Sequence, residues 1–468
     1  MNDDRQAPAV RAFLVLGHLL FLGLFILAYI HALPRTVHVD SAFQIFKWIH
    51  IPGVGVEAHR FSAVIPQLLV KLVMFTGAPL QTLLLVASLA HVLVPYALFV
   101  IIAHVLRIPW IAMALVLAQV LCTRLTFYGI VLEANYLLSY PFLLAALLEG
   151  PLRSSAHPSV LAALVIATLL VLVVHPVGCI IALFVLLFHL VRSGAGKWVV
   201  RSLLILCLLW PFLGRLLFPP TPYEAGLYTS TGEGIGVALG FFGLPGWRFL
   251  VEHTWIHTTH YVSFWCALLT LIILQVRRRA FLELGLVLAS VSVYIVLNVI
   301  TYHQGETAMM MEKNFVPLAT LVALPLLAEL WRQSGRARWF AVASFSLVLF
   351  VQFRSISFAS KPARERMARI QAVVDDCREE GVQKACSRSA TLDAQGLHIH
   401  WALAFETLLL SSVDGPERSV SVVAGDHCPP KTFDADFSGL IPTRTICGNG
   451  STYFRLPFGP YAVLSAHE

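Results

Sequence analysis

The sequence predicts a polytopic α-helical membrane protein that carries a small water-soluble α+β domain at its C-terminal end. Of the 468 residues, 58% are hydrophobic and 13% are charged, whereas about a quarter of a typical soluble chain is charged. Apolar runs of the length that crosses a bilayer recur up to residue 356. Charged residues are concentrated after these apolar runs: 24 of the 59 charged residues follow Phe358. We therefore divide the chain into a transmembrane domain (1–356) and a C-terminal domain (357–468).

Eleven apolar segments are interpreted as membrane spans. The first lacks a small-residue cleavage site and is long enough to remain as an anchor. Pro176 separates two others in the turn "HPVG", because proline interrupts a helix. The predicted spans are 11–33, 79–106, 108–126, 134–149, 158–175, 177–191, 198–218, 260–276, 281–301, 314–332 and 338–356.

The distribution of Lys and Arg predicts a cytoplasmic N-terminus, because cytoplasmic loops are enriched in these residues. Every second short loop is basic when the N-terminus is placed inside, and the odd number of spans then places the C-terminal domain outside. We expect an integral protein of the bacterial inner membrane. The basic residues used are Arg5, Arg11, Arg107, Arg153, Arg192, Lys197, Arg277, Arg278, Arg279, Arg332, Arg336 and Arg338.

Four cysteines of the C-terminal domain favour the same orientation. Cys377, Cys386, Cys428 and Cys447 lack the C-x-x-C spacing typical of zinc sites. We expect two disulfides, which form in oxidising compartments. Three pairings are open, and Cys377–Cys386 with Cys428–Cys447 is the most local. The rest of the domain predicts a helix near its start (363–381) and β-like segments such as "RSVSVVAG".

The predicted topology limits the chemistry to the outer face. The cytoplasmic loops are too short for a nucleotide-binding domain, and the phosphate-binding pattern G-x-x-x-x-G-K-[ST] does not occur. The net charge of +7 is distributed over inner loops and does not indicate a nucleic-acid partner. An activity would therefore use neither cytoplasmic ATP nor a nucleotide sugar directly.

The first outer loop (34–78) predicts two helices that lie along the membrane surface. In "HVDSAFQIFKWIH" (38–50), apolar residues recur every three positions after Asp40, which is typical of an interfacial amphipathic helix. In "EAHRFSAVIPQLLVKLVMFTG" (57–77), Arg60, Gln67 and Lys71 share one face, and Pro66 is expected to bend the helix.

This loop resembles the GT-C superfamily of integral-membrane glycosyltransferases, which use sugars linked to lipid phosphates. "HVDSAFQIF" is similar to the HPDExxQ stretch of the GPI mannosyltransferase branch, with Ser41 in place of the second acid, and "EAHRFSAVIPQLL" is similar to the Glu-x-x-Arg…Pro pattern that follows it. The resemblance implies transfer of a hexosyl or pentosyl group from a polyprenyl-phosphate donor to a glycan, lipid or protein acceptor. No cofactor is assigned, and Ser41 leaves a divalent metal open.

Such a transfer needs a base for the acceptor hydroxyl and positive charge for the departing phosphate. The resemblance assigns the base to Asp40, and Glu57 is the next candidate. Arg60 is expected to pair with the donor phosphate, together with Lys313 and His303 of the outer loop 301–314. Two plainer interpretations stay open: Asp40 caps the helix that starts at Ser41, and Arg60 is a snorkelling side chain.

Further polar residues of the outer face are candidates for accessory roles. His59, Glu306 and Glu312 could contact the acceptor or a metal, although His59 also fits a plain helix terminus and the other two an ordinary solvated loop. Arg124 and Glu133 are expected to form an ion pair that holds a hairpin.

Two other classes of function remain as alternatives. A lipid or polysaccharide transporter or flippase would show internal repeats and paired broken helices, and no repeat is found. A non-catalytic envelope-assembly protein would act through its C-terminal domain. A glycosyltransferase predicts instead that the polar residues converge on one outward cavity beneath the first loop.

Overall fold

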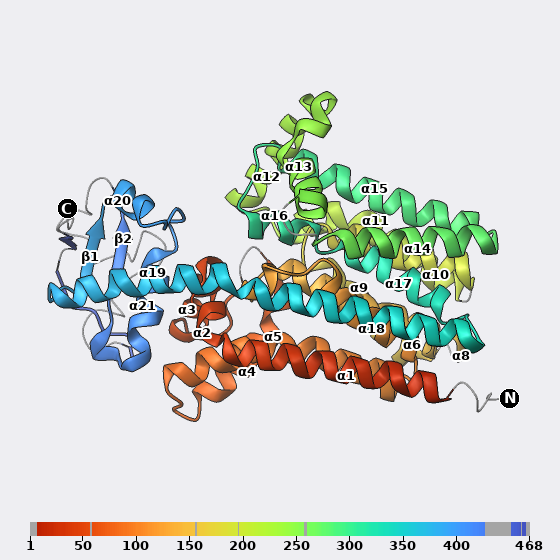
Figure 1. Cartoon of the computed structure of the whole chain (residues 1–468), viewed down its shortest axis with the longest axis horizontal. Coiled ribbons are helices and arrows are strands. Elements are labelled where there is room, and N and C mark those ends of the chain that lie inside the picture. Colours follow the sequence, from red (N-terminus) through yellow and green to blue (C-terminus); the bar gives the residue numbers. More distant parts are fainter. Residues whose placement is uncertain are drawn as a thin grey trace.

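The computed structural model describes residues 7–56, 59–154, 157–194, 196–256, 260–425, 451–459 and 461–464. A bundle of long helices forms most of the molecule, and a small domain of helices and strands covers one end of the bundle (Figure 1). The helix α18 runs along the bundle and is followed directly by α19, which reaches into this C-terminal domain.

The helices have the following bounds. The first half of the chain contains α1 (Ala7–Ile30), α2 (Ala32–Thr36), α3 (Val39–His50), α4 (Val64–Met74), α5 (Leu80–Val100), α6 (Pro109–Leu121), α7 (Tyr140–Glu149), α8 (Pro151–Ser154), α9 (Pro158–Leu172), α10 (Gly178–Arg192) and α11 (Lys197–Leu217). The second half contains α12 (Pro222–Gly236), α13 (Pro245–Val251), α14 (Val262–Arg278), α15 (Phe281–Thr301), α16 (Ala308–Phe315), α17 (Leu318–Leu330), α18 (Gly335–Phe358), α19 (Ser360–Glu379), α20 (Ser389–Ala394) and α21 (Leu403–Ser411).

Six helical segments in the described part of the chain are long and apolar enough to cross a membrane, or seven if one bent pair forms a single span. The prediction of eleven spans is therefore not confirmed. Three predicted spans are the short helices α6, α9 and α10, of 13, 15 and 15 residues. At 1.5 Å per residue such helices cover only about 20 Å, less than the apolar thickness of about 30 Å.

Another predicted span, 134–149, is interrupted near its start. A 3-10 segment (Glu133–Leu138) precedes α7, which begins at Tyr140.

The bent pair that could form a seventh span consists of Glu224–Gly236 and Ala238–Ile256, whose helix axes differ by 99°. The six long segments are Pro8–Ile30, Leu80–Val105, Lys197–Leu217, Phe281–Thr301, Ala308–Leu330 and Gly335–Glu379.

Ion pairs join several helices at the end of the bundle opposite the C-terminal domain (Figure 1). Arg278 contacts Glu283 at 2.6 Å and Glu329 at 2.9 Å, and Arg332 contacts Glu329 at 3.2 Å. These arginines come from two of the loops that the charge rule assigns to the cytoplasm. Their position at one end fits that assignment, and the compartment itself stays a prediction.

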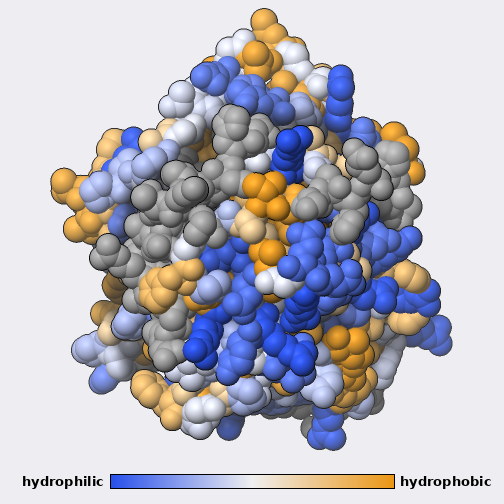
Figure 2. Space-filling view, turned by 90° about the vertical axis from the view of Figure 1, so that its left-hand side faces the viewer, coloured by the Kyte–Doolittle hydropathy of each residue, from blue (hydrophilic) through white to orange (hydrophobic). Residues whose placement is uncertain are grey.

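The end of the molecule that carries the C-terminal domain has many hydrophilic residues on its surface. Figure 2 views the molecule from the side of the C-terminal domain, and hydrophilic residues gather below and to the right of a small hydrophobic cluster at the centre of this face. Along α11, by contrast, Phe212 and Leu216 are more than 70% exposed. Exposed apolar side chains on a helix of the bundle are expected where lipid replaces water as the solvent.

The C-terminal domain is built around a small parallel sheet. Strand β1 (Lys384–Ser387) lies between β2 (Ser421–Ala424) and β3 (Ala462–Val463). The register pairs Ala385 with Val422 on one side and with Ala462 on the other. The predicted N-terminal helix and the strand in "RSVSVVAG" are thus confirmed as α19 and β2.

The first loop packs into the core of this C-terminal domain. Phe46 is fully buried, and its ring lies 5.4 Å from that of Phe405 and 5.3 Å from that of Phe454. The apolar face of α3 therefore contacts protein, and not lipid as the amphipathic pattern suggested. Both surfaces exclude water from apolar side chains, so the pattern alone does not distinguish them.

The second helix of the loop also differs from its prediction. It begins as α4 at Val64, after a 3-10 turn (Phe61–Ala63), so Arg60 precedes the helix. Pro66 lies in the first turn, where its missing N–H breaks no helical hydrogen bond. Lys71 donates to the carbonyl of Ile51 at 2.7 Å, which closes the loop on itself.

The structure does not contain the predicted Cys377–Cys386 disulfide. Cys377 is a free thiol, and both residues are buried within one hydrophobic core. Burial raises the pKa of Cys377 to about 12, so the side chain is a thiol rather than a reactive thiolate. Cys428 and Cys447 lie outside the described residues.

Candidate functional site

A cavity of about 700 Å³ lies where the first loop, the helix bundle and the C-terminal domain meet. Its volume suits a small organic ligand. Its polar side chains come from segments far apart in the sequence. The lining residues are Val39, Asp40, Phe43, Gln44, Arg60, Val131, Leu132, Glu133, Thr221, Pro222, Tyr302, Glu306, Thr307, Met310, Lys313, Asn314, Ile399 and Trp401.

Asp40 enters the cavity from the first turn of α3. The residue that precedes this helix is His38, which makes no side-chain capping bond, so Asp40 is not the cap that a plainer interpretation assigned to it. The half-buried Asp40 carboxylate receives no hydrogen bond from any residue that the structure describes. An acid in the first turn interacts favourably with the helix dipole, but no other group among the described residues occupies its oxygens.

Burial raises the pKa of Asp40 to about 6. Lys313 and Arg60 lower the pKa of this carboxyl, and Glu133 and Glu306 raise it, but burial has the largest effect. A carboxyl with this pKa is ionised at neutral pH and is more basic than an exposed aspartate. It has the properties expected of a general base that works near neutral pH.

Lys313 supplies positive charge to the cavity from α16. The side chain is 6% exposed, and no carboxylate among the described residues forms an ion pair with it. Its neighbour Glu312 is fully buried and accepts hydrogen bonds from the backbone N–H groups of Arg124 at 2.6 Å and Thr126 at 2.9 Å. Glu312 thus ties α16 to the loop 124–126 and fixes the position of Lys313.

Arg60 and Glu133 form an ion pair in the cavity wall. Arg60 Nη1 lies 3.0 Å from Glu133 Oε2, and both side chains are about one-tenth exposed. The predicted pair between Arg124 and Glu133 is therefore wrong. Arg60 lines the cavity with its charge partly neutralised, and its role toward a donor phosphate stays a prediction.

The other predicted residues fall into separate places. Glu306 lines the cavity together with Asp40 and Lys313. Glu312 is turned away from it toward the loop 124–126, so a role for Glu312 in acceptor binding is wrong. His303 does not line this cavity. Glu57 lies outside the described residues.

His59 lines a second, smaller cavity of about 210 Å³. Its backbone is in the left-handed region, with φ of 56°, and its ring packs against that of Phe218 at 5.3 Å. Arg60 lines both cavities, so its side chain lies between them. His59 itself is therefore separated from Asp40.

The acidic residues of the large cavity do not form a metal site. No group of three His, Cys, Asp or Glu side chains in the described part of the chain is arranged to hold a metal ion. Asp40, Glu133 and Glu306 share the cavity, but Glu133 is engaged by Arg60. The described residues therefore do not fit a divalent metal, and we derive no chemical step through one.

Several residues of the site were not predicted. Tyr302 and Asn314 flank predicted residues in the loop 301–314. Trp401, from the C-terminal domain, could contact an acceptor by its sequence, but a place in the folded core is the preferred interpretation there, and it lines the cavity. Trp401 packs edge-on against Phe43, with ring centroids 5.8 Å apart. Glu133 stood out in the sequence as an acid between apolar segments, which is a general signal of function, but the partner predicted for it is Arg124, whereas the structure pairs it with Arg60.

Comparison with known proteins gives no further guidance on this site. None of the family models, curated proteins or solved structures with which the chain was compared matches it.

Proposed function

We propose that the protein is a glycosyltransferase that moves a sugar from a lipid-phosphate-linked donor to an acceptor at the outer face of the membrane. One observation carries the proposal: Asp40 and Lys313 share a cavity, and the part of the chain that the structure describes supplies neither a hydrogen-bond donor to the Asp40 carboxylate nor an ion-pair partner to the buried Lys313 ammonium group. A base and a separate cation are the two groups that such a transfer requires.

The chemistry follows from these two charges. The ionised Asp40 takes the proton of the acceptor hydroxyl as the acceptor oxygen forms a bond to the anomeric carbon of the sugar. The bond between this carbon and the donor phosphate oxygen breaks, and the lipid phosphate leaves with the electron pair. Lys313 stabilises the negative charge that develops on this oxygen. Arg60 contributes less than Lys313, because Glu133 already offsets part of its charge.

The position of the cavity supports a donor that is held in the membrane. Asp40 lies ten residues beyond the last residue of α1, Ile30, and Lys313 lies in the first turns of the segment Ala308–Leu330. Both segments are long and apolar enough to cross a bilayer. Both charged groups therefore lie near the ends of long apolar helices, which supports a donor whose phosphate is held at the membrane surface.

The test is to incubate the purified protein with a panel of polyprenyl-phosphate sugars and candidate acceptors and to measure release of lipid phosphate. We expect release with one donor class, and a loss of about 10²–10⁴-fold in Asp40→Asn, which keeps the size of the side chain but removes the base. Asp414→Asn is the control, because Asp414 is an exposed acid of the C-terminal domain that does not line the cavity.

Two results would refute the proposal. The first is no release of lipid phosphate with any donor, and the second is full release by Asp40→Asn. Transport of an intact lipid-linked sugar across vesicles, without cleavage, would instead indicate a flippase.

A further inference from the structure

The backbone beside Asp40 is held by a residue of the C-terminal domain. Val39 N–H donates to Oε1 of Glu406 at 2.9 Å. Val39 has a φ of +34°, and its β-branched side chain makes this left-handed conformation unfavourable. A strained backbone next to a reactive group persists only where its surroundings enforce it.

Glu406 is in turn fixed by Arg366 of α19. Arg366 Nε donates to Oε1 at 2.8 Å and Nη2 donates to Oε2 at 2.7 Å, which is a bidentate pair, and Glu406 is fully buried. Arg366 Nη2 also donates to the carbonyl of Ile399 at 3.0 Å, and Ile399 lines the cavity. The same pair thus contacts two parts of the cavity wall.

The first turn of a helix has N–H groups without partners inside the helix. His38 does not satisfy them with its side chain, and the Glu406 carboxylate does so from another domain. Without this acceptor, nothing in the described residues would hold Val39 in its strained conformation. A regular φ at Val39 would redirect the first turn of α3 and with it the carboxylate of Asp40.

We propose that Glu406, held in place by Arg366, is a positioning residue that aims Asp40 into the cavity. The effect on catalysis rests on the proposed function, but the orientation of residue 40 can be measured without it. Glu406 touches neither the cavity nor a substrate in this account and acts only through the Val39 N–H group.

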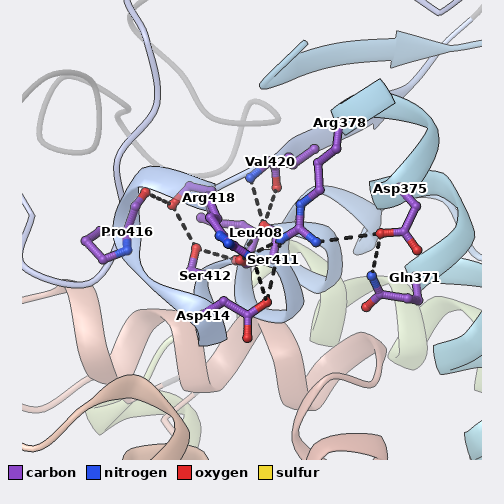
Figure 3. Close-up of polar contacts among 11 residues, drawn as sticks. Gln371, Asp375, Arg378, Leu408, Ser411, Ser412, Asp414, Pro416, Arg418 and Val420 are labelled. Atoms are coloured by element: carbon purple, nitrogen blue, oxygen red, sulfur yellow. Dashed lines mark hydrogen bonds and ion pairs between the residues drawn. The ribbon is translucent and has the colours of Figure 1, made fainter. Parts of the chain in front are cut away.

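The test compares two double variants that both remove the buried charges. Arg366→Leu/Glu406→Leu leaves Val39 N–H without an acceptor, whereas Arg366→Gln/Glu406→Gln retains an amide oxygen at residue 406. Buried ion pairs can often be replaced by apolar groups without loss of the fold. Arg378→Gln is the matched control. Arg378 lies on the same helix and donates to the carbonyl of Ser411 at the end of α21 (Figure 3). Its contacts Ser411, Asp375 and Asp414 do not line the cavity.

Turnover and donor KM are measured first. We expect the Leu pair to lower turnover by about 10²-fold, as misplacement of a reactive group by an ångström can do, with an unchanged donor KM. The Gln pair should recover most of the turnover, and Arg378→Gln should retain it. Equal turnover in the Leu and Gln pairs would overturn the proposal.

A second measurement does not depend on transfer. The thiol introduced by Asp40→Cys is alkylated by a water-soluble reagent in each background, and the rate should change in the Leu pair and return toward the starting value in the Gln pair. Equal rates in both would overturn the positioning role. Absence of transfer in the unmodified protein would refute the proposed function alone, and the alkylation rates would still decide the positioning role.

Correct folding is checked through Cys377, which is buried in the C-terminal domain and should stay unlabelled in every variant. If the Cys377 thiol becomes exposed in the Arg366→Leu/Glu406→Leu variant, a Val39→Pro variant is used in place of that double variant. Proline removes the N–H donor and forbids a positive φ, and it is tolerated in the first turn of a helix. The same loss of turnover and the same change in alkylation are expected, and normal values for both would overturn the proposal.

Discussion

Arg60 Nη1 lies 3.0 Å from Glu133 Oε2 in the wall of the cavity that contains Asp40. The pair joins the first loop to the segment that precedes α7, over 73 residues of sequence. It also divides the positive charge of the cavity unequally, because Arg60 is in direct ion-pair contact with a carboxylate, whereas no carboxylate among the described residues is in such contact with Lys313. The electrostatic environment of Asp40 is therefore set by four charged residues from three separate segments, Arg60, Glu133, Glu306 and Lys313.

The rate of sugar transfer should depend on pH through Asp40. Only the ionised carboxylate can accept a proton, so turnover should fall as the pH drops below the pKa of about 6 that burial produces. We expect a tenfold loss for each pH unit well below this value. A pH–rate profile shows this loss as its acidic limb, the part in which turnover falls at low pH. A midpoint of the acidic limb near the ordinary aspartate pKa of 3.8 would contradict the assignment of Asp40 as the base.

Two substitutions should move this limb in opposite directions. Lys313 lowers the pKa of Asp40 and Glu133 raises it. Lys313→Met should therefore shift the acidic limb to higher pH, in addition to lowering turnover through the lost cation. Glu133→Gln should shift the limb to lower pH. The profiles are compared with that of Asp414→Asn, which should leave the midpoint unchanged, and a shift of both variants in one direction would be inconsistent with the geometry.

Asp40 should reduce the stability of the folded protein at neutral pH. Its folded pKa is above the unfolded value, so the folded state binds the proton more tightly, and stability falls as the pH rises from about 4 to about 6. The cost is at most about 3 kcal/mol, and less because the side chain is only half-buried.

Asp40→Asn removes this charge and should unfold at a higher temperature than the native protein at pH 7.5. The difference should vanish near pH 4, where both side chains are neutral. Thermal unfolding followed in detergent measures both values. A variant that is less stable at pH 7.5 would show that Asp40 is chiefly a structural residue.

Cys377 should be a free thiol in the folded protein. Its burial in the C-terminal core predicts slow alkylation under native conditions and full alkylation after denaturation without a reducing agent. Mass spectrometry of the modified peptide measures both. A peptide that is alkylated only after reduction would show that Cys377 is in a disulfide.

The predicted orientation can be tested at the two ends of the bundle. Asp414→Cys places a thiol on the exposed surface of the C-terminal domain, and Arg336→Cys places one in the exposed first turn of α18 at the basic end. An impermeant thiol reagent applied to intact cells should label only the former. Labelling of the latter alone would invert the topology and exclude an extracytoplasmic site.

The sequence by itself determined the class of the protein and the first candidate of its site. Apolar runs and the concentration of charge after Phe358 report solvent preference, which is a local property of each segment. For the same reason the sequence located Asp40, Arg60 and Lys313 as polar groups at the ends of apolar runs. All three line one cavity in the structure.

The tertiary structure decided which partners these residues have. The Arg60–Glu133 pair, the burial of Glu312 against the loop 124–126 and the contact of α3 with the C-terminal domain all join segments that are distant in sequence. Ion pairing and apolar burial depend on distance in space, and an apolar helix face fits a protein core and a lipid surface equally well. The position of Glu406 behind Asp40 exists only because 367 residues of chain fold back to bring it there.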